Sequence, residues 1–130
     1  MTASCRVVAA GSGDGTFSLR FELTNHGTQP LELPSYEPFL AFSVHAEADG
    51  VPVPVHEPEL DIAVQRTTIR VPVGETITVE TPIRLRIAAG AAPGSDGFEW
   101  TVPHAPQGLT LRATLNLPPD FAGTYPVALS

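Results

Sequence analysis

The stretch TFSLRFELTNHGTQPLEL, residues 16–33, contains the pattern that decides how this chain folds. Apolar and polar side chains alternate strictly from Phe17 to Leu23. Such alternation is typical of a β-strand that buries one face. The turn-favouring residues 25–27, Asn-His-Gly, then interrupt it, and the alternation resumes at Leu31. The stretch therefore predicts a strand, a turn and a second strand.

The same alternation recurs along the rest of the chain. Its 14 prolines and 11 glycines interrupt the apolar runs at short intervals, and no segment has helical periodicity. Candidate strand segments lie at residues 16–24, 30–33, 39–47, 51–55, 69–73, 77–87, 109–117 and 125–129, with additional short candidates at 6–10 and 98–102. The prediction is one all-β domain over residues 1–130, an antiparallel immunoglobulin-like β-sandwich of about seven to nine strands. A small closed barrel is the alternative.

Several local signals refine this prediction. Asp49-Gly50 predicts a tight hairpin. Pro52 and Pro54 cannot donate hydrogen bonds to a neighbouring strand, so the segment 51–55 should lie at a sheet edge, and residues 6–10 are also expected at an edge. The apolar positions change phase between Val64 and Ile69, which predicts a bulge or a break near residues 65–68.

Composition excludes several classes of function. The chain has 130 residues and a net charge of −7, and its seven basic residues are all Arg, so no basic surface is expected for nucleic acid. The single cysteine, Cys5, cannot form an internal disulfide, which is typical of a reducing compartment. Residues 1–15 lack the pattern of a signal peptide, and no apolar run is long enough to span a bilayer. We expect a cytoplasmic protein without a membrane partner.

Four pieces of the sequence carry a family resemblance: FSLRFELTNHGTQPLEL, DGVPVP, VPVGETITVETPIRL and FAGTYPVAL. Their turns and strand order resemble those of small bacterial immunoglobulin-like domains, although Val73 stands where that group usually has Pro. Within the group, the chain is similar to the intracellular proteinase inhibitor type and to the accessory domain of deuterolysin-like metallopeptidases. The resemblance implies a β-sandwich with an inhibitory or chaperoning role.

An acidic segment with two histidines is the candidate metal site. His45, Glu47, Asp49 and His56 are the predicted ligands, and Glu57, Glu59 and Asp61 follow closely. The Asp49-Gly50 hairpin would bring His56 alongside the strand that carries His45 and Glu47. Their spacing matches no known zinc or calcium motif. The alternative is a solvated acidic edge that discourages aggregation between strands.

Aromatic residues near proline-rich loops are the candidate partner-binding residues. They are Tyr36 and Phe39 beside the loop 34–38, and Trp100 and His104 beside the loop 103–106. Tryptophan is frequent at binding hot spots, but it is also a frequent core residue of sandwiches, and we favour the core for Trp100. A stiff loop at 34–38 or 103–106 would suit a protease inhibitor.

No sequence motif for catalysis is present, so we expect a non-enzymatic protein without a cofactor. The preferred function is a module that presents loops or an edge strand to a protein partner. Self-association through an edge strand, giving a homodimer, is one form of this. The alternative is a protein that binds a divalent metal or a small ligand through residues 45–61.

Overall fold

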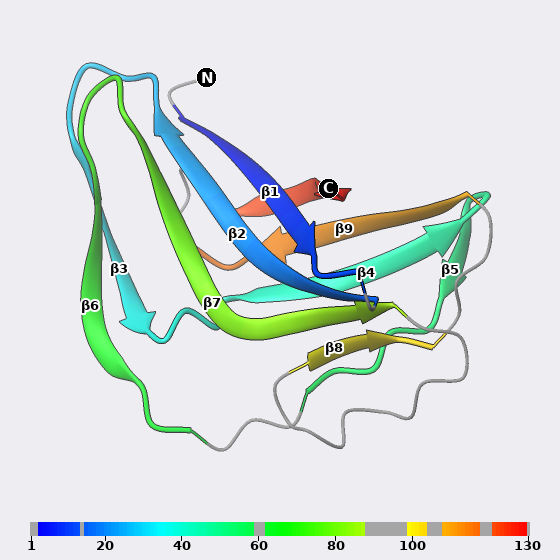
Figure 1. The fold of residues 1–130 in the computed structure, drawn as a ribbon. Coiled ribbons are helices and arrows are strands. Elements are labelled where there is room, and N and C mark those ends of the chain that lie inside the picture. The colour runs from blue at the N-terminus through cyan, green and yellow to red at the C-terminus, as the bar shows by residue number, and fades with distance from the viewer. Residues whose placement is uncertain are drawn as a thin grey trace.

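The chain folds into ten β-strands within the described residues. The computed structural model describes residues 3–13, 15–58, 62–87, 99–103, 108–117 and 121–129. The strands (Figure 1) are β1 (Ala3–Gly11), β2 (Thr16–Asn25), β3 (Leu31–Glu37), β4 (Phe42–Ala48), β5 (Val51–Val53), β6 (Gln65–Val71), β7 (Thr76–Ile87), β8 (Glu99–Val102), β9 (Leu109–Leu115) and β10 (Gly123–Leu129). The all-β prediction is confirmed.

Eight of these strands form one mixed sheet in the order β5-β4-β9-β10-β1-β2-β7-β8, and β3 and β6 form a separate antiparallel ribbon. The predicted antiparallel arrangement is wrong for two pairs, because β1 pairs with β10 and β7 pairs with β8 in parallel. Residues 6–10 consequently lie in an interior strand, with β2 on the other side, and not at an edge.

The large sheet curls until its two edges nearly meet. His56, three residues after β5, forms a bridge with Thr101 of β8. Its N–H donates to the Thr101 carbonyl oxygen at 2.8 Å, and the Thr101 N–H donates back at 3.0 Å. The architecture is thus close to a barrel. The bridge joins β8, the strand at one edge of the sheet, to the chain that follows β5, the strand at the other edge (Figure 1).

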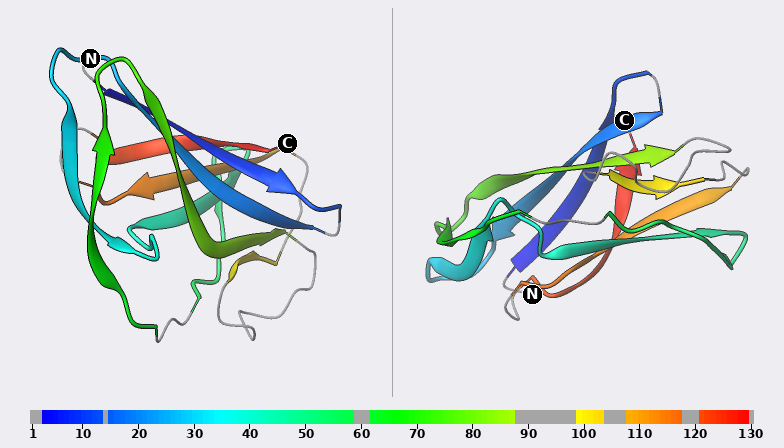
Figure 2. Two further views of the ribbon diagram at one scale, coloured as in Figure 1. Left: turned by 60° about the vertical axis from the view of Figure 1, so that its left-hand side comes forward. Right: turned by 90° about the horizontal axis from the view of Figure 1, so that it is seen from below.

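The alternating side chains fill the interior of this curled sheet. Phe21 of β2 faces Phe42 of β4 with ring centroids 4.9 Å apart, and the right-hand view of Figure 2 shows β2 lying across from β4. Phe39 and Trp100 complete an aromatic cluster around Phe42, at centroid distances of 6.0 and 6.4 Å. Aromatic pairs at such separations stabilise a core beyond their buried area.

The chain passes between the large sheet and the ribbon twice at one corner, and Asn25 forms hydrogen bonds to both connections. β2 continues into β3 and β6 continues into β7, so both connections pass from one sheet to the other. The fully buried Asn25 side chain donates to the carbonyl oxygens of Gln29 at 2.8 Å and Val71 at 3.0 Å, and accepts from the Gly27 N–H at 2.8 Å. The predicted turn is present, but neither Asn25 nor Gly27 has a positive φ.

The backbone of Asn25 fixes the second connection at the same corner. Its N–H donates to the Glu75 carbonyl oxygen at 3.1 Å, and its own carbonyl oxygen accepts from the Gly74 N–H at 3.0 Å. Gly74 has φ 74°, a conformation that favours glycine. Every polar group of Asn25 is therefore used inside the protein.

The local predictions hold for the hairpin and fail at two other segments. β5, which contains Pro52, is an edge strand of the large sheet, and the Asp49-Gly50 turn joins it to β4. The bulge or break predicted near residues 65–68 is absent, because these residues lie within β6 in continuous register with β3, and the strand itself begins at Gln65. The segment 34–37 was expected to be a loop, but it continues β3 through Pro34, which a strand with a single neighbour tolerates.

Replacing Asn25 should destabilise the whole domain. We expect Asn25→Ala to lower the free energy of unfolding by at least about 2 kcal/mol, because it leaves the buried Val71 carbonyl without this partner and opens a cavity. The exposed Asn116 offers a matched control, and Asn116→Ala should change the value by less than about 0.5 kcal/mol. Urea unfolding measures both. Equal effects for the two variants would contradict the role given to Asn25.

Candidate functional site

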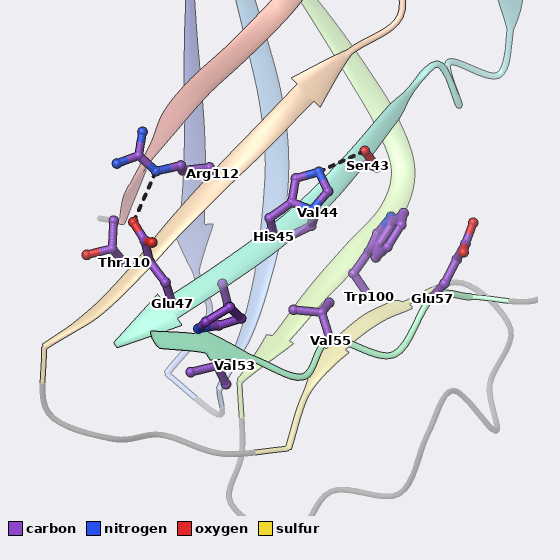
Figure 3. A pocket seen from close by; sticks show the side chains of 12 residues that line it. Ser43, Val44, His45, Glu47, Val53, Val55, Glu57, Trp100, Thr110 and Arg112 are labelled. Carbon is purple, nitrogen blue, oxygen red and sulfur yellow. Dashed lines mark hydrogen bonds and ion pairs between the residues drawn. The ribbon is translucent and has the colours of Figure 1, made fainter. Parts of the chain in front are cut away.

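The main candidate site is a cleft of about 540 Å³ that crosses β4 near the edge of the large sheet (Figure 3). One wall is formed by the outer face of β4 and β9, and the other by the chain from β5 to Glu57 together with Trp100 of β8. Its volume is in the range of ligand-binding pockets. The lining residues are Ser43, Val44, His45, Ala46, Glu47, Pro52, Val53, Val55, Glu57, Trp100, Thr110 and Arg112.

The cleft exists because β5 separates from β4 after Val53. The hairpin register pairs Ala48 with Val51 and Ala46 with Val53. If it continued, Val55 would lie opposite Val44 and His56 opposite Ser43. The chain instead turns toward β8, where His56 bonds to Thr101. A gap therefore opens between β4 and the segment 55–57.

This gap leaves part of the β4 edge without a neighbouring strand in the described structure. The Asn116 N–H donates to the Ala41 carbonyl oxygen at 2.8 Å, in register with the β4–β9 ladder. Because bonded pairs alternate in antiparallel strands, the odd-numbered residues of β4 bond to β9 and the even-numbered ones face the other way. Ala46 and Ala48 face β5, whereas Val44 directs its N–H and C=O into the gap.

At the next even-numbered residue, Phe42, the main-chain N–H already has a partner. Its N–H donates to the Leu40 carbonyl oxygen at 2.9 Å. Val44 is therefore the position of β4 where both main-chain groups are directed toward the cleft.

Charged side chains lie at the rim of the cleft. The apolar side chains of the wall opposite β4 form its floor. Arg112 pairs with Glu47 through an Nε–Oε1 contact of 3.3 Å, and the His45 ring lies 3.2 Å from the Ser43 hydroxyl. Glu57 is exposed and has no ion pair within the described residues. Between these groups lie Val53, Val55 and Trp100 (Figure 3). The site thus combines an apolar floor with one carboxylate, that of Glu57, which has no ion-pair partner in the part of the chain that the structure describes.

The predicted metal ligands do not form a metal site in the described part of the chain. No group of three or more His, Cys, Asp or Glu side chains is placed to hold an ion there. His45 and Glu47 lie on the cleft, Asp49 lies in the hairpin turn, and His56 bridges to β8 instead of standing beside β4. The expectation that the hairpin aligns His56 with β4 is wrong, because β5 ends at Val53. Glu59 and Asp61 lie outside the described residues.

The predicted partner-binding aromatics have different environments. Tyr36 on β3 is 50% exposed, whereas Phe39 is 4% exposed and packs against Phe42 and Phe21. Phe39 is therefore a core residue and not part of an exposed loop. Trp100 is 8% exposed, in agreement with the core position that we favoured, yet it also lines the cleft. His104 lies outside the described residues.

The Cys5 thiol lacks the lowered pKa and the exposure of a catalytic nucleophile. Burial, with a smaller contribution from the nearby charge of Glu22, raises the pKa of its thiol to about 12. Burial also raises the pKa of Tyr125 from its ordinary value, and the charge of Cys5 adds to this effect. A cysteine activated for catalysis has a lowered pKa. The Cys5 thiol accordingly stays protonated near neutral pH.

Sequence reasoning missed Val44, Val55 and Arg112 as residues of the site. Arg112 of β9 is 65 residues from Glu47, and only the strand pairing brings them together. Val55 looked like a continuation of the hairpin strand. Pro54 gave no clear signal that pairing stops at Val53, because Pro52 equally lacks an N–H and still lies within β5, opposite Glu47.

Comparison of the chain with protein-family models, with curated proteins and with solved structures finds no match. Within the described residues, no helix has the length and apolar character required to cross a membrane.

Alkylation should reveal the protonated state of Cys5. We expect the folded protein to react slowly with iodoacetamide at pH 8, with a rate that rises only well above pH 9, because only the thiolate reacts. The same chain in urea should react with a midpoint near the ordinary thiol pKa. Mass spectrometry of quenched samples follows both reactions. A folded-state midpoint below that of the unfolded chain would contradict the assignment and make Cys5 a candidate nucleophile.

Proposed function

We propose that the chain is a non-enzymatic binding module that takes up an extended segment of a protein partner along the open edge of β4. The main support is the position of Val44, whose N–H and C=O face the cleft without a neighbouring strand in the described structure. An extended peptide can pair with such an edge through main-chain hydrogen bonds. The apolar floor at Val55 and Trp100 offers a place for one of its side chains.

The contrast between the two edges at the β4–β5 hairpin favours this site. The hairpin pairing directs the Pro52 nitrogen away from β4, so the outer edge of β5 lacks a donor at that position. Proline and charge are common means of blocking an edge strand against unwanted pairing. The β4 edge beside the cleft has neither a proline nor a covering strand among the described residues. At this hairpin the outer edge of β5 carries a proline, whereas the β4 edge beside the cleft carries none.

The more detailed predictions about function are kept as proposals. The immunoglobulin-like assignment, the cytoplasmic location and the role of a protease inhibitor belong to this group. An inhibitory loop at 34–38 has little support, since residues 34–37 belong to β3, and the loop 103–106 lies largely outside the described residues. Binding of a divalent ion through residues 45–61 has no specific support from the described side chains.

Selection of peptides tests the proposed function. A library of random extended peptides selected on the full chain should return binders that change the fluorescence of Trp100, the single tryptophan. Val44→Pro should weaken such a binder at least about tenfold, because it removes the N–H donor, while Val44→Ala keeps the donor and should bind more strongly than Val44→Pro.

Both variants are first checked for folding by thermal unfolding, because Val44 is also a core residue. The proposal is contradicted if the selection returns no binder. It is also contradicted if binders leave Trp100 fluorescence unchanged and bind Val44→Pro as well as Val44→Ala.

A further inference from the structure

We infer that the partner segment carries a basic residue two positions from an apolar one, and that Glu57 selects for the basic residue. This inference rests on the proposed function, because it concerns what occupies the same cleft. It depends on the arrangement of charge along the wall opposite β4, where Val53, Val55, Trp100 and Glu57 follow one another (Figure 3).

Most charged or polar side chains at the cleft already have a partner in the protein. Glu47 is paired with Arg112 at 3.3 Å, so their charges largely compensate one another. The His45 ring is 3.2 Å from the Ser43 hydroxyl. On β8, next to Trp100, Glu99 is paired with Arg86 at 3.9 Å. These residues offer little unbalanced charge to a ligand.

Glu57 differs from them in having no cationic partner within the described residues. It is exposed, and it lines the same cleft as Trp100. A ligand cation at this position would gain an ion pair and, close to Trp100, a favourable contact with the aromatic ring. An acidic residue would instead meet both Glu57 and a protein with a net charge of −7.

The apolar floor determines a second residue of the ligand. Side chains of an added strand alternate between its two faces, so two residues that both point toward the wall with Val55, Trp100 and Glu57 are two positions apart in sequence. The expected recognition pattern is therefore an extended segment with an apolar residue and a basic residue two positions apart. The charge of the chain disfavours a second copy as the occupant, since two copies with −7 each repel one another.

The same library selected on three forms of the full chain tests this inference. On the wild-type protein, we expect enrichment of peptides with a Lys or Arg two positions from an apolar residue. On Glu57→Lys, the enrichment should change to peptides with Asp or Glu. Glu75→Lys is the matched control, because it changes the net charge equally at an exposed position in the turn between β6 and β7, and it should retain the preference for basic peptides.

Affinity measurements on one selected peptide complete the test. Replacing its basic residue by Gln should weaken binding to the wild type by about threefold, the scale of an exposed ion pair, and should have no such effect on Glu57→Gln.

The outcomes separate the two claims. Binders that depend on the Val44 N–H but show no charge preference overturn the role of Glu57 and leave the proposed function standing. A preference that Glu75→Lys abolishes as strongly as Glu57→Lys shows attraction by net charge only, and also overturns the inference. A selection without any binder overturns both claims.

Discussion

The buried Asn25 side chain is the constraint on which the rest of the structure depends. It bonds to the connection between β2 and β3 through Gln29 and Gly27, and to the end of β6 through Val71. A buried amide is costly unless its hydrogen bonds are satisfied, and here three side-chain bonds satisfy it. The two chain crossings are therefore bonded to the same buried side chain, which fixes them relative to one another.

That corner explains how the large sheet can curl around its core. Because β3 and β6 leave the sheet side by side, β2 and β7 remain paired along most of their length. The pairing is irregular opposite Ser18 to Arg20, next to Pro82, where the Thr81 hydroxyl donates to the Phe39 carbonyl oxygen at 2.6 Å. The bend of β7 seen in Figure 1 brings β8 toward the chain after β5 and so defines the far wall of the cleft.

The sequence was sufficient to predict most of the strands, but not which strands pair with one another. Alternating residues identify the buried face of β2 and β7, and Asp49-Gly50 identifies a hairpin, since both signals are local. Alternation is the same in parallel and antiparallel strands that bury one face, so the pairing of β1 with β10 left no signal. The cleft depends on the bridge between His56 and Thr101, 45 residues apart in the chain, which is why its residues were only partly anticipated.

Amide hydrogen exchange of the free protein tests the central claim, the open edge of β4, most directly. Ser43 and His45 face β9, and their amides should be protected, whereas the Val44 amide between them should exchange at least about tenfold faster although its side chain is buried. NMR spectra recorded after transfer to D₂O resolve the three amides. Fast exchange at Val44 alone would match an edge prepared for another strand. Equal protection of all three would show that the edge is already occupied and would contradict the account.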